Sequence, residues 1–158
     1  MAEKSAGILL FRRKREEPEV LLVHPGGPFW ARKDKGAWSI PKGVYGADED
    51  PLLAARREFA EEIGCSIEGN FIALGSFKQP SGKVVTAWAL ESDVDATTCK
   101  SNFFSLEWPP RSGQKKYFPE VDRVGWFTPR VAMEKILNGQ KPLLAKLLSL
   151  LDLQQGIG

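Results

Sequence analysis

Apolar residues recur at helical spacing between Asp50 and Gly64, in the clearest periodic pattern of the chain. At about 100° per residue, one face of the predicted helix is an apolar stripe made of Leu52, Ala55, Phe59 and Ile63. Asp50 is suited to cap the N-terminus of this helix, Pro51 to occupy its first position, and Gly64 to end it. The segment is therefore predicted to be a helix that buries one face.

Shorter apolar runs elsewhere predict β-strands separated by turns. They lie at residues 5–12, 20–23, 71–77, 84–91, 103–108 and 124–127. The charged segment 13–18 predicts a turn that joins the first two strands into a hairpin or makes them neighbours. Residues 79–83 include Pro-Ser-Gly and predict a hairpin between the third and fourth strands.

The C-terminal part of the chain predicts two helices, at residues 129–137 and 143–151, which cover a face of the sheet. The second is rich in leucine and has more apolar positions than one narrow stripe needs, so it is also suited to a dimer interface. We therefore expect a monomer or a homodimer. Before these helices, residues 111–116 predict a basic, glycine-containing loop that either folds over phosphates or is solvated. Periodicity alone favours an α/β or α+β fold.

Length and composition describe one ordinary globular domain. The chain has 158 residues, of which 42% are hydrophobic and 27% are charged. We expect a single domain over residues 1–158, with a core large enough to be stable. The formal net charge of +2 is too small for a protein that coats nucleic acid, so no duplex nucleic acid is expected as a partner. Local basic loops remain compatible with the phosphates of a small-molecule nucleotide.

The sequence shows neither a targeting segment nor a membrane span. The N-terminus lacks a long apolar run, and no stretch approaches the roughly 20 apolar residues that cross a bilayer. Cys65 and Cys99 do not have the spacing of metal ligands. We expect a soluble, cytoplasmic protein without a membrane partner.

Three carboxylates, those of Glu58, Glu61 and Glu62, converge on an arc beside the apolar stripe. On a fully solvated helix, like charges at this spacing cost only about 0.2–0.5 kcal/mol per pair, so an ordinary surface is one explanation. On a partly desolvated face, an effective dielectric near 20 and about 5 Å between charges give roughly 3 kcal/mol of repulsion per pair. A divalent cation would relieve that repulsion, and Mg²⁺ is the ion that oxygen ligands favour.

The spacing of these acids within a longer motif resembles that of a known family. The motif consists of Gly43, five residues, Glu49, seven residues, Arg57-Glu58-Phe59, one residue, Glu61-Glu62, one residue, and Gly64-Cys65. It resembles the Nudix box, the signature of the Nudix (MutT-like) hydrolases. Phe59 and Cys65 occupy positions where that family usually has an aliphatic residue, which affects packing more than chemistry. The resemblance implies an α/β/α sandwich with a mixed central β-sheet, and a Mg²⁺ cofactor for which Mn²⁺ is a possible substitute.

The resemblance also implies a metal site. Its ligands would be Glu58 and Glu62, joined by the backbone carbonyl of Gly43 and by Glu61. In similar proteins a late acid just ahead of a strand often joins the cluster. Glu120 is our choice for that ligand and Asp122 the reserve, although either acid is equally explained as a plain loop residue.

The resemblance assigns two further roles, one catalytic and one structural. Water is the nucleophile, and the general base is Glu58, or else Glu61, because the position of the base varies among similar proteins. Glu49 and Arg57 would form an ion pair that holds the loop against the helix. Arg57 paired with Glu61 four residues on is the ordinary surface-helix alternative.

Candidate substrate contacts lie before the box and in the later hairpin. Arg32 and Lys35 belong to a glycine-broken basic loop, which either faces a polyphosphate or is solvated. Lys42 adjoins the box glycine, and Lys83 lies at the mouth of the 79–83 hairpin. Phe29, Trp30 and Trp38 could stack on a nucleobase or simply pack in the core or the loop.

Two other residues before the box invite a catalytic interpretation that the sequence does not support. His24 is the only histidine of the chain, and without partners for a catalytic triad it is better explained as structural. Ser39 has no histidine base near it in the sequence, so nucleophilic serine chemistry is not supported.

The function predicted from the resemblance is a Mg²⁺-dependent pyrophosphohydrolase that acts on a nucleoside diphosphate linked to a further group X. The approach to the box and the basic loops favour a dinucleoside polyphosphate or a nucleoside triphosphate as substrate, with ADP-ribose as the alternative. The rival hypothesis is a non-catalytic module of the same fold that binds a nucleotide. The complete set of acids argues against that rival.

Overall fold

The computed structural model describes residues 3–14 and 17–157. The described chain contains eight β-strands, three α-helices and two short 3-10 helices. In chain order the elements are β1 (Lys4–Lys14), β2 (Glu17–Pro25), β3 (Lys42–Val44), α1 (Pro51–Ile63), β4 (Ile72–Lys78), β5 (Val84–Glu91), η1 (Ala96–Thr98), β6 (Phe103–Glu107), β7 (Lys115–Pro119), β8 (Val121–Phe127), α2 (Pro129–Lys135), η2 (Asn138–Gln140) and α3 (Lys141–Ile157).

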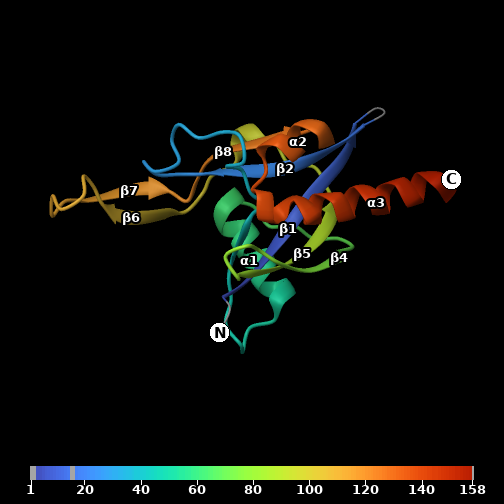
Figure 1. The fold of residues 1–158 in the computed structure, drawn as a ribbon, viewed down its shortest axis with the longest axis horizontal. Coiled ribbons are helices and arrows are strands. Elements are labelled where there is room, and N and C mark those ends of the chain that lie inside the picture. The colour runs from blue at the N-terminus through green and yellow to red at the C-terminus, as the bar shows by residue number, and fades with distance from the viewer. Residues whose placement is uncertain (1–2, 15–16, 158) are drawn as a thin grey trace.

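The main sheet is mixed, as the sequence predicted. Its strands lie in the order β4-β5-β1-β2-β8, and β3 pairs with β1. β1 and β5 run parallel over their whole shared length, whereas the other neighbours are antiparallel. β1 is central because its first half pairs with β3 and its second half with β2. The short strand β3 thus fixes the start of the box against the middle of the sheet (Figure 1).

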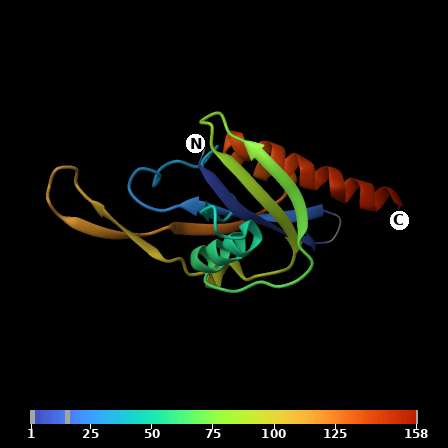
Figure 2. The same ribbon diagram turned by 90° about the horizontal axis from the view of Figure 1, so that it is seen from below.

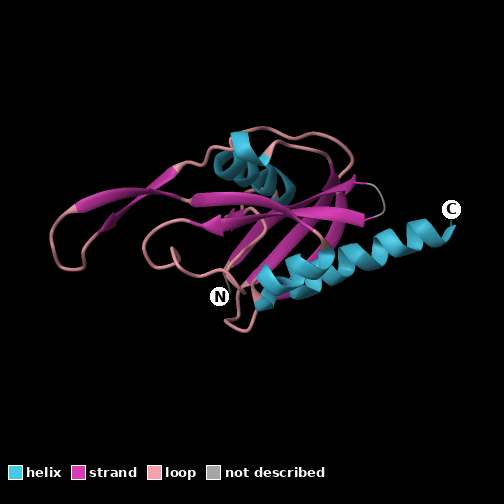
Figure 3. Ribbon diagram, turned by 90° about the horizontal axis from the view of Figure 1, so that it is seen from above, coloured by secondary structure: helices cyan, strands magenta, loops and turns pink. Residues whose placement is uncertain are grey.

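Each face of the sheet carries its own apolar core. Leu9 and Phe11 of β1 face the cluster that includes α3, while Ile8 and Leu10 face the cluster that includes α1. This two-residue alternation, apolar on both faces, is typical of a strand buried between two helical layers. Figures 2 and 3 show α1 and α3 on opposite sides of the sheet. The predicted α/β/α sandwich is confirmed.

The helix predicted from the box is α1, and its boundaries follow from its caps. The Asp50 carboxylate accepts the N–H of Leu53 at 3.0 Å. Gly64 adopts a left-handed conformation with φ of 87° and donates its N–H to the carbonyl of Ala60. Glycine adopts this conformation without the steric cost that a side chain would add. The buried face consists of Ala54, Ala55, Phe59 and Ile63.

Two strands were not predicted, and both depend on a distant pairing partner. β3 has only three residues and pairs with residues 5–7 of β1. β7 contains Lys115 and Lys116, so the prediction of a loop over 111–116 was wrong in its second half. β7 pairs with β6 to form a separate two-stranded sheet, which projects from the body of the molecule (Figure 1). β7 begins with two lysines, so its sequence lacks the run of apolar residues that predicts a strand.

No helix in the described part of the chain has the length and apolar character needed to span a membrane.

Candidate active site where α1 meets β3

The box glycine and the first box glutamate of α1 are in direct contact. A Cβ built on Gly43 would overlap the carboxyl group of Glu58. Only glycine therefore lets this carboxylate lie against the backbone of β3. The side chain of Glu58 is 16% exposed, so its charge is largely withdrawn from water.

Glu62, one turn later on α1, is also held by the backbone of β3. Its Oε2 accepts the backbone N–H of Lys42 at 2.9 Å. Burial, with the negative charge of Glu58 as the second cause, raises the pKa of Glu62 to about 8. The carboxylate is thus placed where its charge is costly unless a cation lies beside it.

Neighbouring groups shift the pKa of Glu58 in opposite directions. Burial and the nearby charge of Glu61 raise the pKa of Glu58, whereas Arg57 lowers it. Nη1 of Arg57 donates to Oε1 of Glu58 at 2.8 Å. The guanidinium therefore orients this carboxylate and offsets part of the repulsion among the acids.

Arg57 also joins the loop before α1 to the helix. Its Nε and Nη2 donate to the two oxygens of Glu49, at 3.0 and 3.2 Å. Its Nη1 lies 3.6 Å from Oε1 of Glu61. Both pairings considered from the sequence are present, and the two-pronged contact with Glu49 has the better geometry.

Glu120 comes to this cluster from the far end of the chain. Its negative charge contributes to the raised pKa of both Glu58 and Glu62. Two hydrogen bonds fix the backbone of Glu120. Its N–H donates to the carbonyl of Asn102 at 2.8 Å, and its carbonyl accepts the N–H of Gly26 at 2.9 Å. Asp122, the reserve candidate, has Oδ1 2.7 Å from Nδ1 of His24 and is occupied there.

His24 is fully buried and connects two segments. Its Nε2 donates to the carbonyl of Lys33 at 2.6 Å, and its ring packs edge-on against Trp38. His24 thus ties the 26–37 loop to β8 through Asp122, consistent with the structural role expected for it. The partner of His24 lies 98 residues away, so no local signal in the sequence could reveal this link.

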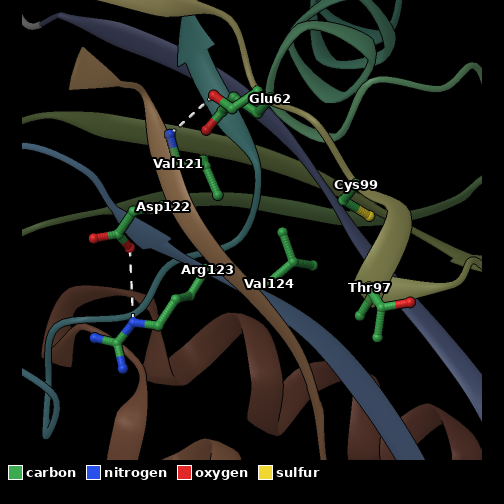
Figure 4. Close-up of a pocket in the computed structure, with 9 residues that line it drawn as sticks. Glu62, Thr97, Cys99, Val121, Asp122, Arg123 and Val124 are labelled. Atoms are coloured by element: carbon green, nitrogen blue, oxygen red, sulfur yellow. Dashed lines mark hydrogen bonds and ion pairs between the residues drawn. The ribbon is translucent and has the colours of Figure 1, made fainter. Parts of the chain in front are cut away.

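Two cavities adjoin Glu62. One, of about 240 Å³, is lined by Trp30, Ser39, Lys42 and Glu120 in addition to Glu62. The other, of about 280 Å³, lies between η1 and β8 and includes Thr97, Cys99, Ser101, Asp122 and Arg123 (Figure 4). Val121 lines both, and its N–H donates to Oγ of Ser101 at 2.9 Å. Glu62 therefore borders both cavities, which meet at the start of β8.

The predicted substrate residues do not all reach these cavities. Lys42 lines the first, and burial lowers the pKa of its ammonium group. Trp38 is only 4% exposed, and its ring packs in the core between His24 and Phe127. Trp30 provides the aromatic wall of the first cavity instead.

The remaining predicted substrate residues lie farther out. Arg32 and Lys35 are exposed and do not line either cavity. Lys83 forms an ion pair with Glu3 at 3.0 Å. Of the three aromatic residues that the sequence offered for stacking on a base, only Trp30 lines the first cavity.

A sequence model of the NUDIX domain matches residues 1–147. The chain belongs to the NUDIX family. The resemblance inferred from the box is thereby confirmed over nearly the whole chain.

Two curated relatives have sequences similar to parts of this NUDIX domain. An RNA pyrophosphohydrolase of Gluconacetobacter diazotrophicus is 39% identical over 64 residues, which is 40% of this chain and 33% of that protein. A MutT-like protein of Streptomyces ambofaciens is 26% identical over 77% of this chain and 63% of its own length. The chain thus matches less than two thirds of the length of either relative.

Solved structures confirm the NUDIX fold. An Ap4A hydrolase of C. elegans in a binary complex is 21% identical, with a TM-score of 0.65 over 94% of this chain and 98% of that one. The NUDIX domain of Shewanella oneidensis NrtR, complexed with ADP ribose, is 18% identical, with a TM-score of 0.67 over 96% and 89% of the two chains. At these identities the likeness establishes the fold alone.

The donor groups of the box suit a hard divalent cation. They are carboxylate and carbonyl oxygens, and the pKa values of Glu58 and Glu62 are raised by burial and by the charges of neighbouring acids. Within residues 3–14 and 17–157, no three acidic, histidine or cysteine side chains already converge as a complete metal cluster. Glu58 is turned toward Arg57 and Glu62 toward the amide of Lys42, while Glu61 is 42% exposed.

Proposed function

We propose that this NUDIX domain is a pyrophosphohydrolase dependent on Mg²⁺, or on Mn²⁺ as a substitute, that cleaves a nucleoside diphosphate linked to a group X. The observation that carries the proposal is the position of Glu62, a half-buried carboxylate that borders two cavities and whose pKa is raised by burial and by the charge of Glu58. Holding a negative charge at such a position lowers the stability of the protein, and carboxylates with a raised pKa beside a cavity are concentrated at functional sites.

The metal ligands in this proposal are Glu58, Glu62 and the carbonyl of Gly43, joined by Glu61 and Glu120. The contact between Gly43 and Glu58 supports this set, because it brings a carbonyl-bearing backbone and a carboxylate together. A bound Mg²⁺ supplies positive charge that stabilises the bridging phosphate oxygens and the leaving group.

The side chains of the protein prepare the reaction in three ways. Arg57 orients Glu58, which accepts the proton of the attacking water, with Glu61 as the second candidate for this base. The amide of Lys42 keeps Glu62 directed toward the cavities. Trp30 and Lys42 offer an aromatic face and a cation to the nucleotide in the first cavity.

The two cavities favour a substrate with bulky groups on both sides of the scissile pyrophosphate. A dinucleoside polyphosphate is such a molecule, and ADP-ribose is another, whereas a nucleoside triphosphate would fill one side. The Ap4A hydrolase and the ADP-ribose complex with similar folds support the first two classes. Cys65 and Cys99, both free thiols, are compatible with the cytoplasmic location expected from the sequence.

The deciding experiment is product chromatography after incubating the protein with diadenosine polyphosphates, nucleoside triphosphates and ADP-ribose. Each reaction is run with Mg²⁺ and with EDTA. We expect Mg²⁺-dependent cleavage of at least one class, and no turnover by a Glu62→Gln variant. Glu68→Gln is the matched control, since the side chain of Glu68 is 88% exposed.

Two outcomes would contradict the proposal. Full activity of Glu62→Gln would refute the assignment of Glu62 to the metal. Absence of cleavage in every reaction, together with tight nucleotide binding by calorimetry, would favour the non-catalytic nucleotide-binding module instead.

A further inference from the structure

The hairpin of β6 and β7 projects from the domain directly before Glu120. Figures 1 and 2 show it extending away from the sandwich. It forms its own two-stranded sheet, and none of residues 103–119 is part of either apolar core. A two-stranded hairpin is only marginally stable alone in water. The direction in which this hairpin lies is therefore determined by its contacts with neighbouring segments.

One face of the hairpin carries the rings of Phe104 and Trp108. The N–H of Trp108 donates to the carbonyl of Gln114 at 2.9 Å, which continues the ladder of β6 and β7 beyond Glu107. Because side chains alternate along a strand, two residues that are four positions apart lie on the same face. The same face carries Phe118, whose ring lies 6.0 Å from that of Phe104. Three aromatic rings are thus gathered on this face.

This aromatic face lies against the loop that follows β2. The ring of Phe104 would be 3.0 Å from a Cβ built on Gly27. The ring of Trp108 packs edge-on against that of Phe29, with the centroids 5.4 Å apart and the planes at 83°. The hairpin therefore supports residues 27–29 along one side.

The loop is also held at both of its ends. The N–H of Gly26 donates to the carbonyl of Glu120 at 2.9 Å, and a Cβ built on Gly26 would overlap the carbonyl of Pro119. At the other end, Nε2 of His24 lies 2.6 Å from the carbonyl oxygen of Lys33. The hairpin and the residue that follows it thus hold the loop at 26, 27 and 29, and β2 holds it at 33.

Trp30 lies between these attachments. Its carbonyl accepts the N–H of Lys33 at 2.9 Å, and Nζ of Lys33 lies 5.0 Å from the centroid of its ring. The ring packs in part against the apolar core on the α3 side of the sheet and lines the first cavity together with Glu62. Its neighbour Phe29 is 61% exposed and has its ring contact with Trp108. The hairpin therefore supports the chain immediately before the aromatic wall of this cavity.

We propose that Phe104 and Trp108 are positioning residues for nucleotide binding, because they hold the 26–33 loop where the ring of Trp30 meets the base in the first cavity. Neither residue lines that cavity, so they act through the loop and not on the ligand. This inference rests on the proposed pyrophosphohydrolase function and adds the residues that set the affinity of that site for the nucleotide.

The expected signature is a change in KM without a matching change in kcat. Glu58 and Glu62 are held by Arg57 and by the amide of Lys42, which are contacts outside the hairpin. Loss of the hairpin contact therefore moves the aromatic wall and leaves these carboxylates in place. A contact that binds the ground state and the transition state equally changes KM alone.

The test measures kcat and KM with diadenosine tetraphosphate and Mg²⁺, and the Kd for ADP by calorimetry. Trp108→Ala should raise the KM and the Kd about tenfold, the scale of losing one base–aromatic stack, with kcat within about twofold of wild type. Trp108→Phe retains an aromatic ring at the contact and should restore most of the affinity.

The other face of the hairpin provides a matched control. Phe103 is 65% exposed and Tyr117 is 72% exposed. They share a face, because Ser105, two residues after Phe103, is the register partner of Tyr117. The Phe103→Ser/Tyr117→Ser variant removes two rings from the same hairpin without touching the loop contact, and it should change neither KM nor Kd.

A double-mutant cycle tests whether Trp108 acts through Trp30. Trp30→Ala should itself raise the KM and the Kd. Adding Trp108→Ala to that variant should cause no further loss, because the ring that Trp108 positions is already absent. Fully additive effects would show that Trp108 acts independently of Trp30 and would overturn the proposal.

Phe29→Ala keeps the proposal testable if Trp108→Ala does not fold. It breaks the same contact from the loop side, at a residue that is mostly exposed, and should raise the KM and the Kd in the same way. Unchanged values in Phe29→Ala, or a fall in kcat at constant KM in either variant, would overturn the positioning role.

Binding of ADP separates this inference from the function on which it rests. If diadenosine polyphosphates, nucleoside triphosphates and ADP-ribose all remain uncleaved with Mg²⁺, the proposed function fails, and the Kd for ADP still tests the positioning role. A Kd that Trp108→Ala or Phe29→Ala raises about tenfold would then support it. An unchanged Kd, or no binding of ADP by the wild type, would overturn it.

Discussion

The acidic face of α1 and the hairpin of β6 and β7 place charge in opposite environments. Glu58 and Glu62 are largely withdrawn from water, and burial raises the pKa of each. Lys115 and Lys116 are exposed on a sheet that lacks a core. The difference teaches that the charges of α1 are held at a cost that a bound cation would offset, whereas those of the hairpin are solvated and screened by salt.

The largest effect is expected from Glu62→Gln. The amide oxygen of glutamine can still accept the N–H of Lys42, so the fold should survive while the negative charge is lost. We expect kcat to fall by about 10²–10³ or more, the usual scale for losing one group that stabilises transition-state charge. Steady-state kinetics with Mg²⁺ measure this, and circular dichroism checks the fold. A variant within twofold of wild type would show that this buried charge is not part of the chemistry.

Gly43→Ala tests the contact between β3 and α1 without removing an acid. The new methyl group would collide with the carboxyl group of Glu58. Overpacking of this kind costs about 1–3 kcal/mol, and we expect a similar loss of unfolding free energy in urea, with a marked loss of activity. Gly46→Ala is the matched control, since a Cβ there has no neighbour within 4 Å. Equal stability of the two variants would contradict the close packing.

The raised pKa of Glu62 predicts how stability depends on pH when EDTA removes divalent metal. The folded protein binds this proton more tightly than the unfolded chain, whose carboxyl titrates near 4.5. The stabilising contribution is therefore complete below about pH 4.5 and is lost as the pH rises through about 8. We expect the unfolding free energy of the wild type to fall over this range by an amount on the order of a few kcal/mol, and its melting temperature to fall with it.

Two comparisons check the origin of that pH dependence. Glu62→Gln should flatten the decline, and Mg²⁺ at pH 8 should raise the melting temperature of the wild type much more than that of the variant. An identical pH profile for both proteins would place the titrating group elsewhere.

The smallest effect is on stability. Phe103→Ser/Tyr117→Ser should change the unfolding free energy by less than about 0.5 kcal/mol, since both rings are mostly exposed. Urea denaturation beside Gly43→Ala makes the comparison direct. A loss as large as that of Gly43→Ala would mean that these rings stabilise the fold.

The parts predicted from sequence are those that local residues determine. The boundaries of α1 follow from Asp50, Pro51 and Gly64, all within one short segment. The hairpin of β4 and β5 likewise follows from its turn, where the N–H of Gln79 donates to Lys83. The box residues were identified because their spacing is itself a local pattern.

The parts not predicted depend on contacts between distant segments. β3 and β7 are strands because they pair with β1 and β6. The sequence offered both Trp30 and Trp38 for stacking, but which of them is buried follows from how the 26–37 loop folds back onto His24. Periodicity does not describe such tertiary contacts.

The hairpin of β6 and β7 leaves and rejoins the body at one place, where the N–H of Glu120 donates to the carbonyl of Asn102 at 2.8 Å. It is held a second time by the 26–30 segment, where Phe104 lies against Gly27 and Trp108 against Phe29. The hairpin and this loop are therefore mechanically coupled, and a change in the angle of one would carry the other with it.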